Sequence, residues 1–305
     1  MQRYLFSRII QSLLLMFGVL VIVFFMVRLT GDPAALLINR DFAGPEQMAA
    51  MRAALGLDKP THLQFVDYMT RLLSGDFGYS LRFRQPTLEV IFSGLPITFL
   101  LAGLSLTIAV LVAVPLGIVG GTSPNSWVDF LARVVGLLGQ VTPSFWLALI
   151  FIWVFAVNLR WFPSFGIDSA NAYVLPAVAL SVGGMGQLAR LTRSAVLEIR
   201  NEDYIRTARS KGLSPRAIAK NHVTRNAALA LISVIGVQFT YALGGSVYIE
   251  TIFAIPGMGW MLNEAIRSRD FVMVQSLTIF IATFAIVMNL ITDILYAAID
   301  PRIRY

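Results

Sequence analysis

The sequence contains no cysteine and only two histidines. Without cysteine the chain has no disulfide and no thiolate metal site, although the redox state of its compartment stays open. The histidines, His62 and His222, have no metal-ligating partner at helical spacing. The motifs G-x-S-x-G, H-E-x-x-H and G-x-x-x-x-G-K-[ST] do not occur. We therefore expect no metal site and no nucleotide hydrolysis on this chain, and an intramembrane enzyme is a disfavoured alternative.

Charge is also scarce: 13% of the 305 residues are charged, 57% are hydrophobic, and the mean hydropathy is +0.72. A soluble domain of this length is normally less apolar. Six stretches lack Asp, Glu, Lys and Arg, and each can hold the ~20 residues that cross a bilayer. They are Ile9–Val27, Val90–Val128, Val134–Leu159, Ser169–Ala189, Asn226–Ile249 and Phe271–Thr292. The first is too long for a signal-peptide core and no A-x-A site follows it. We predict an all-α membrane protein with six transmembrane helices.

Lys and Arg predict the orientation. The loop Arg190–Arg225 carries nine of them against three acids, so we expect it to be cytoplasmic, together with both termini. Two amphipathic helices are predicted in the first outer loop, within "GPEQMAAMRAALGL" and "THLQFVDYMTRLLSG". The expected organisation is a first transmembrane helix at 1–29, an extended periplasmic loop at 30–94, a five-helix core at 95–300 containing the loop 190–225, and a cytoplasmic tail at 301–305.

The loop contains the basic run "RTARSKGLSPRAIAK", residues 206–220. Leu197, Tyr204, Ile205 and Ala208 share one helical stripe, which predicts an amphipathic helix over about 195–211. Gly212 would end it in the left-handed conformation, and Ser214 and Pro215 would begin a second short helix.

The basic run allows two other interpretations. One is a solvated basic loop that only orients the membrane helices. The other is a DNA-binding helix-turn-helix, to which Ala208, Gly212 and Ile218 conform in spacing. Only 36 residues separate the two flanking membrane segments. That leaves no room for a third helix and a tether, so we expect no nucleic-acid partner.

Polar residues within the predicted membrane helices are candidates for a solute pathway. They are Gln140, Thr142, Ser144, Gln238, Thr240, Tyr241 and Ser246. Small and hydroxyl-bearing residues also pack membrane helices without any further role, so the alternative of packing stays open. For Asp293, near the end of the last helix, pairing with an arginine is favoured over a role in transport.

Motifs along the whole chain resemble one family. The basic run stands where permease subunits of bacterial ABC importers carry the cytoplasmic E-A-A-x-x-x-G loop, with Arg206 and Thr207 replacing its first two letters. The segments "VRLTGDPA", "LLSGDFGYSL", "VTPSFWLALIFIWVF", "IFAIPGMGWML" and "DILYAAIDPRIRY" resemble the dipeptide/oligopeptide/nickel class in order and spacing. In "RNAALALI" a proline frequent in that class is missing.

The resemblance implies a type I importer permease in the bacterial inner membrane, with a coupling helix pair that docks on an ATPase. It assigns coupling to Tyr204, Arg206, Thr207, Ala208, Gly212 and Leu213, and an outer gate or receptor platform to Pro256, Gly257 and Gly259. It implies as partners a second permease, two ATPase subunits that bind ATP and Mg, a periplasmic binding protein and membrane lipid. The cargo, whether a dipeptide, longer peptide, glutathione, opine, sugar or nickel complex, would be set by the binding protein.

Overall fold

The computed structural model describes residues 2–30, 44–54, 56–218 and 225–299, and this part of the chain is almost entirely helical. The predicted tail at 301–305 and His222 lie outside it. The helices are α1 (Gln2–Thr30), α3 (Pro45–Ala54), α4 (Thr61–Leu73), α5 (Thr87–Thr122), α6 (Trp127–Val141), α7 (Ser144–Phe151), the π-helix η1 (Ile152–Asn158), the 3₁₀-helix η2 (Ala170–Tyr173), α8 (Val174–Arg200), α9 (Asp203–Ser210), α10 (Pro215–Ile218), α11 (Arg225–Ile252), α12 (Met258–Arg267) and α13 (Phe271–Ile299). A short antiparallel hairpin, β1 (Tyr79–Ser80) and β2 (Gln85–Pro86), precedes α5.

Long apolar helices dominate the architecture. Within the described ranges, four helices are long and apolar enough to cross a bilayer, or five if the bent pair of α6 with α7 and η1 is one span. The helix α11 has 28 residues, about 42 Å at the ~1.5 Å rise per residue of an α-helix, which exceeds the ~30 Å hydrocarbon core. Its length therefore suits a further span.

The third predicted span, Val134–Leu159, is not one continuous helix. The chain bends by 102° between α6 and the segment Ser144–Asn158. Thr142 and Pro143 adopt extended conformations at the break. A residue before proline is driven away from the helical region, and proline is well tolerated where a new helix begins. An uncharged run therefore contains two helices that differ in direction.

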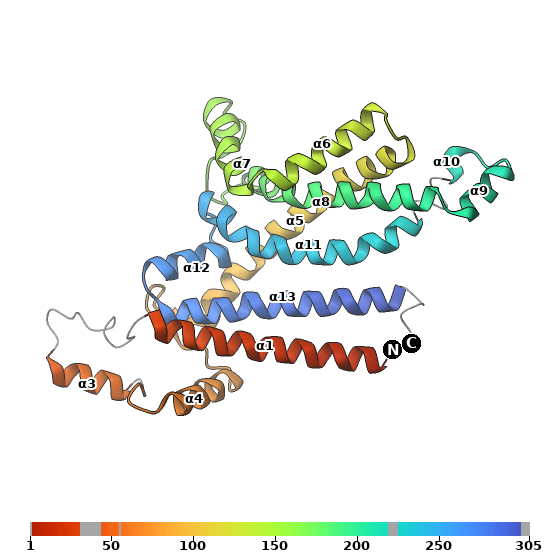
Figure 1. The fold of residues 1–305 in the computed structure, drawn as a ribbon. Helices are drawn as coiled ribbons and strands as arrows, with labels where there is room; N and C mark the ends of the chain where they lie inside the picture. The colour runs from red at the N-terminus through yellow and green to blue at the C-terminus, as the bar shows by residue number, and fades with distance from the viewer. Residues whose placement is uncertain (1, 31–43, 55, 219–224, 300–305) are drawn as a thin grey trace.

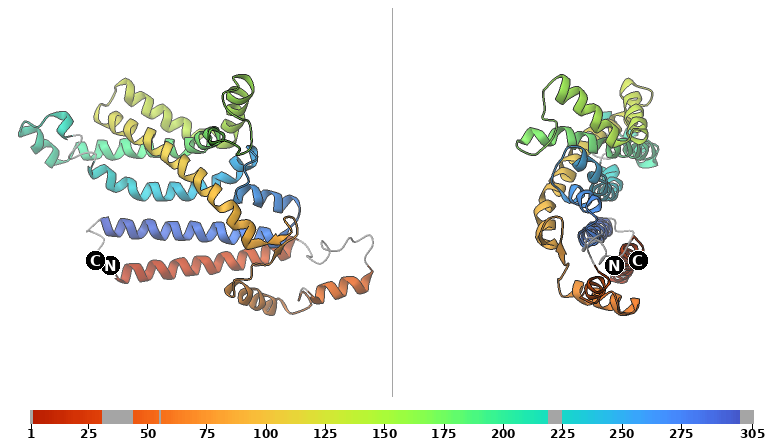
Figure 2. Two further views of the ribbon diagram at one scale, coloured as in Figure 1. Left: turned by 180° about the vertical axis from the view of Figure 1, so that it is seen from behind. Right: turned by 90° about the vertical axis from the view of Figure 1, so that its left-hand side faces the viewer.

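The long helices α1, α8, α11 and α13 run roughly parallel to one another and connect two opposite ends of the molecule (Figure 1). The helices α1 and α13 lie side by side, α11 lies next to α13, and α8 lies next to α11. The pair α9 and α10 lies at the end where α1 begins and α13 finishes, whereas α12 lies at the opposite end. The view from behind shows α5 crossing the others diagonally (Figure 2).

Glycines allow α5 and α8 to pack closely. A Cβ atom on Gly117 would lie 2.6 Å from Cβ of Thr192, and one on Gly121 would lie 2.6 Å from Cγ1 of Val196. Gly117 and Gly121 are four residues apart, so both face the partner helix, as in the small-x-x-x-small pattern of membrane helices. Close backbone approach therefore joins α5 to the helix that leads into α9.

Among the described residues between α1 and α5, the two predicted helices form, and α4 packs along α1. The rings of Phe24 and Phe65 lie 5.0 Å apart, and those of Phe17 and Phe65 lie 6.2 Å apart, in edge-to-face contacts. Arg28 Nε donates to Gln64 Oε1 at 2.9 Å. Since Phe17 lies well inside the apolar run of α1, α4 covers the side of a membrane helix.

Candidate translocation cavity and coupling helices

A cavity of about 300 Å³ opens between α5, α7, α8 and α11. Its walls combine apolar groups with small and polar side chains contributed by all four helices. The polar members and glycines are Ser105, Ser144, Ser181, Gly183, Gly184, Gln187, Gln238, Tyr241 and Gly245. Because the side chains of glycine and serine are small, backbone groups and the amides of Gln187 and Gln238 are accessible to a solute in the cavity.

Two glutamines from different helices meet in this cavity. Gln238 Nε2 of α11 donates to Gln187 Oε1 of α8 at 2.7 Å, and Gln238 is 6% exposed. Each amide carries both donors and acceptors, so this bond leaves further groups available for a ligand. Among the described residues, no charged side chain lines the cavity. Such a wall suits a neutral or zwitterionic polar solute better than a strongly bound ion.

Three of the seven predicted pathway residues, Ser144, Gln238 and Tyr241, line the cavity. The other four do not. Gln140 Oε1 accepts from Arg190 Nη1 at 3.0 Å, and Thr142 forms the end of α6 at the bend. Thr240 Oγ1 donates to the Gly236 carbonyl at 3.5 Å, and buried Ser246 donates to the Leu243 carbonyl at 2.8 Å. These hydroxyls bond within α11, the usual arrangement in membrane helices.

Ser105, Ser181 and Gln187 also line the cavity, and sequence reasoning missed them. Ser105 and Ser181 are isolated hydroxyls in long apolar runs, where packing is the commoner role. Gln187 lies three residues before Arg190, so the sequence places it near the end of a predicted membrane span. The only available signal was its polar side chain within α8, and that signal does not identify the face on which it lies.

The basic run forms two short helices at the end of α8. The predicted single helix over 195–211 is wrong, because α8 continues to Arg200 and a break precedes α9. The predicted turn is confirmed: Gly212 has φ +77°, in the left-handed region, and the Ala217 N–H donates to Ser214 Oγ at 3.3 Å as α10 begins. The sharp angle of the pair follows from this glycine and this cap.

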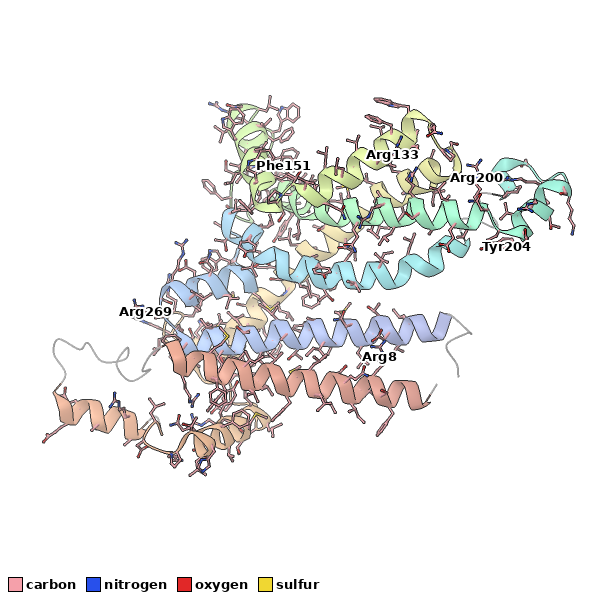
Figure 3. The ribbon with its side chains drawn as sticks, viewed as in Figure 1. Arg8, Arg133, Phe151, Arg200, Tyr204 and Arg269 are labelled. Carbon is pink, nitrogen blue, oxygen red and sulfur yellow. The ribbon has the colours of Figure 1, made fainter. Side chains whose placement is uncertain are left out.

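A small apolar core holds the pair against α8. Ala208 and Ile205 of α9, Ile218 of α10 and Val196 of α8 are buried together. Ala208 is thus enclosed by its own chain at the crossing of the two helices. Tyr204, Arg206, Thr207 and Leu213 are exposed around this core. Figure 3 shows Tyr204 at the far end of α8, beyond Arg200.

A buried carboxylate joins α6 to α8 near this end. Asp129 is completely buried and accepts from Arg193 Nε and, at 3.2 Å, from Arg193 Nη2. The Asn125 N–H donates to Asp129 Oδ2 at 3.0 Å, and Arg133 Nη2 lies 3.6 Å from the same oxygen. Arg200 Nη1 also donates to the Thr122 carbonyl at 3.1 Å. The turn between α5 and α6 is therefore fastened to the last turns of α8.

At the opposite end, the predicted gate segment enters α12 through a turn held by two other helices. Thr98 Oγ1 of α5 accepts the Met258 N–H at 2.9 Å, and Glu250 Oε2 of α11 accepts those of Gly259 at 2.7 Å and Trp260 at 3.1 Å. The first N–H groups of a helix lack internal partners, and a carboxylate there also interacts favourably with the helix dipole. Glu250 is fully buried.

The predicted gate glycines pack against these groups. A Cβ atom on Gly257 would lie 2.5 Å from Glu250 Oε2, and one on Gly259 would lie 2.4 Å from Cα of Val247. Pro256 is half-buried beside them. Sequence reasoning assigned Glu250 to an outer loop by its charge and did not find this contact.

Asp293 of α13 pairs with an arginine, as favoured from the sequence. Arg8 Nε of α1 lies 3.4 Å from Asp293 Oδ2, and both side chains are partly exposed. Figure 3 places Arg8 between α1 and α13.

Long apolar helices around a polar cavity, with a basic helix pair that shares a buried core at one end, are features expected of a membrane permease. Residues 113–305 match the family of binding-protein-dependent transport system inner membrane components, and residues 1–102 match the family of their N-terminal regions. The chain belongs to this family. It is the permease subunit of an ABC importer and a multi-pass protein of the inner membrane.

Relatives align over their full length. A Brucella abortus (strain 2308) protein named for a peptide transport system permease is 40% identical over 314 residues, covering 100% of both chains. The glutathione transport system permease protein GsiC of Salmonella typhimurium is 38% identical over 310 residues, again covering 100% of both. ATP hydrolysis belongs to separate chains in such importers. The alternatives of a DNA-binding regulator and an intramembrane enzyme find no support in these relatives.

Solved structures share the fold. The MetNI methionine ABC transporter in inward facing conformations matches with a TM-score of 0.57 at 19% identity, over 70% of this chain and 98% of that one. An amino acid ABC transporter solved with histidines matches with a TM-score of 0.53 at 20% identity, over 70% and 94%. These matches confirm the predicted type I importer permease fold.

Proposed function

We propose that the chain forms half of a translocation path for peptides or related small solutes. The observation that carries this proposal is the polar cavity between α5, α7, α8 and α11, in whose wall Gln187 and Gln238 are hydrogen-bonded to each other. Amide and hydroxyl groups can exchange hydrogen bonds with peptide groups without holding a cargo too tightly to release it. The relatives named for peptide and glutathione transport support the same substrate class.

We assign ATPase coupling to the α9–α10 pair. Tyr204, Arg206, Thr207 and Leu213 are the surface for the ATPase, while Ala208 and Gly212 fix the angle between the helices. A pair with its own buried core moves as one body, and a solvated loop would not. Because α8 continues from this pair to Gln187, a displacement of the pair reaches the cavity through one helix.

The remaining assembly follows from this assignment. Two ATPase subunits that bind ATP and Mg take the α9–α10 end, and a second, homologous permease completes the path. A periplasmic binding protein docks at the α12 end, where Pro256, Gly257 and Gly259 form the outer gate. Both termini and the α9–α10 pair then face the cytoplasm, in accord with the nine basic residues of the loop 190–225.

Uptake of labelled peptides by cells that express the complete importer tests the cavity. Gln238→Leu and Gln187→Leu keep the side-chain volume but remove the amides. We expect either variant to lower peptide uptake about tenfold, with normal subunit assembly. Thr240→Val, which alters a hydroxyl that bonds within its own helix, should transport normally. Equal uptake by all three variants and the wild type would refute the cavity as the path.

Single-cysteine labelling tests the orientation, because the chain has no cysteine of its own. In intact cells an impermeant thiol reagent should label Tyr79→Cys, which is exposed, and should spare Ser214→Cys. Disruption of the membrane should make Ser214→Cys reactive. The reverse pattern would overturn the orientation while leaving the family membership intact.

A further inference from the structure

The helix α4 has two apolar faces. One face packs on α1 through Phe65, whose ring lies 5.0 Å from that of Phe24. The other face exposes Leu63, Val66 and Leu73, which are 45%, 56% and 84% exposed and recur at helical spacing. A helix that adds an exposed apolar stripe beside a membrane span is typical of one lying in the bilayer interface. We therefore place α4 against the side of α1 that faces lipid, with its exposed stripe in contact with the bilayer.

A cavity of about 380 Å³ opens at the C-terminal end of α4. Its walls come from α4, from the segment around β1 and from the beginning of α13. Leu72, Phe77 and Phe271 supply apolar surface, and Tyr68, Arg71, Arg269 and Gln275 supply polar groups. Figure 3 shows Arg269 at the end of the molecule opposite Tyr204, just before α13 begins.

Both carboxylates of this cavity accept hydrogen bonds from the chain itself, Asp270 through both oxygens and Asp76 through Oδ1. Asp270 accepts from the Ser80 hydroxyl at 2.6 Å, from the Arg82 N–H at 3.0 Å and, through its other oxygen, from the Met273 N–H at 3.1 Å. Asp76 Oδ1 accepts the Gly78 N–H at 2.9 Å. Both acids that line the cavity therefore serve the local fold.

The donors of the cavity are available. The Tyr68 hydroxyl and Gln275 Nε2 are buried near each other, and among the described residues neither has a hydrogen-bond partner of good geometry. In the described part of the chain, Arg71 and Arg269 form no ion pair. Buried donors without acceptors are unfavourable, and guanidinium groups favour phosphate oxygens with which they form paired hydrogen bonds. The ligand that satisfies this set is rich in acceptors, anionic and partly apolar.

We propose that this cavity binds the phosphate headgroup of an anionic phospholipid. The phosphate lies between Arg71 and Arg269 and accepts from Gln275, and the lipid chains follow the exposed stripe of α4. This site is separate from the solute path and from ATPase coupling. Its failure would leave the proposed function untouched. The bound lipid would fasten α4 to the start of α13.

The test uses the complete importer in nanodiscs of phosphatidylcholine, with or without phosphatidylglycerol. Phosphatidylglycerol should raise the thermal midpoint of the wild type, and native mass spectrometry should find it retained. Arg71→Gln/Arg269→Gln should weaken that retention about tenfold or more, because charge-assisted hydrogen bonds are lost. The matched control is Arg84→Gln. Arg84 is an exposed arginine in the turn between β1 and β2, outside the cavity, and this variant should behave as the wild type.

A second variant separates ligand binding from packing. If Gln275 only packs, Gln275→Leu removes an unsatisfied donor and stabilises the protein equally in both lipids. If it donates to a phosphate, the variant loses part of the shift that phosphatidylglycerol causes. Equal shifts in the wild type and both variants would overturn the proposal. So would an equal shift caused by inorganic phosphate in phosphatidylcholine, since the site would then take a free anion.

Discussion

Arg193 of α8 donates two hydrogen bonds to the buried carboxylate of Asp129, the third residue of α6. Seven residues further along α8, Arg200 holds the carbonyl of Thr122, the last residue of α5. The same end of α8 leads directly into the α9–α10 pair. A force applied to that pair therefore acts on α5, α6 and α8 together, and these three helices include two walls of the cavity.

Removal of the arginine should show how much this contact contributes. Arg193→Gln leaves Asp129 buried with only the Asn125 N–H and the more distant Arg133. We expect a loss of about 1–3 kcal/mol of unfolding free energy, the range for leaving a buried polar group unsatisfied. Thermal unfolding of the purified permease measures it.

Two further variants make this prediction specific. Arg133→Gln removes an exposed partner at 3.6 Å and should cost less than about 1 kcal/mol. Asp129→Asn combined with Arg193→Gln removes both charges and should be milder than Arg193→Gln alone. Equal losses for Arg193→Gln and Arg133→Gln would contradict a central role for the pair.

Charge and glycine positions predicted much of this fold. Runs without charge located the membrane helices, and Gly212 located the turn of the basic pair, because each is a local property. The bend at Thr142–Pro143 was missed, since an uncharged run looks alike whether straight or bent. Asp129 lies between two of the predicted spans, and its partner could not be identified because Arg193 is 64 residues away in sequence. The cavity walls depend on which faces of α5 and α8 meet, and that is a property of tertiary packing.

Gly212 should be replaceable only by residues that accept its backbone conformation. Its φ of +77° is strained for a β-branched side chain, by about 1–2 kcal/mol, whereas space is not limiting, because no atom lies within 4 Å of the position that a Cβ would take. Gly212→Val should therefore reorient α10, reduce copurification of the ATPase and uncouple hydrolysis from uptake. Gly212→Asn, which tolerates this conformation, should remain coupled. Full coupled uptake by Gly212→Val would return the loop to a purely topological role.

Glu250 should act as an acceptor for the beginning of α12. Glu250→Leu leaves the N–H groups of Gly259 and Trp260 buried without their partner, so we expect a loss of about 1–3 kcal/mol and a fall in uptake. Glu250→Gln keeps one carbonyl oxygen and should lose less. Melting curves and uptake assays distinguish the two variants. Indistinguishable behaviour would mean that the turn into α12 does not depend on this side chain.

Gly257 should tolerate no side chain. A Cβ atom there would lie 2.6 Å from Thr98 Oγ1 as well as 2.5 Å from Glu250 Oε2, so Gly257→Ala must displace the contacts that hold α12. We expect uptake to fall severalfold while the permease still assembles. Gly103→Ala is the control, because no atom lies within 4 Å of the added carbon. Normal uptake by Gly257→Ala would remove this turn from the gate.

Tyr68 should make stability depend on pH in alkaline solution. Burial raises the pKa of its phenol from 10.0 to about 12, and the neighbouring Gln275 and Arg28 oppose that shift. The folded state thus favours the neutral phenol. Its contribution to stability is complete below pH 10 and is lost as the pH rises through about 12. Tyr68→Phe, which cannot ionise, should unfold with a shallower pH dependence across this window, whereas Tyr248→Phe, at an exposed position, should follow the wild type. Thermal midpoints measured at intervals from pH 9 to about 12 decide the matter. Parallel curves for Tyr68→Phe and the wild type would show that the phenol ionises without cost to the fold, and that the contact between α4 and α13 is open to water.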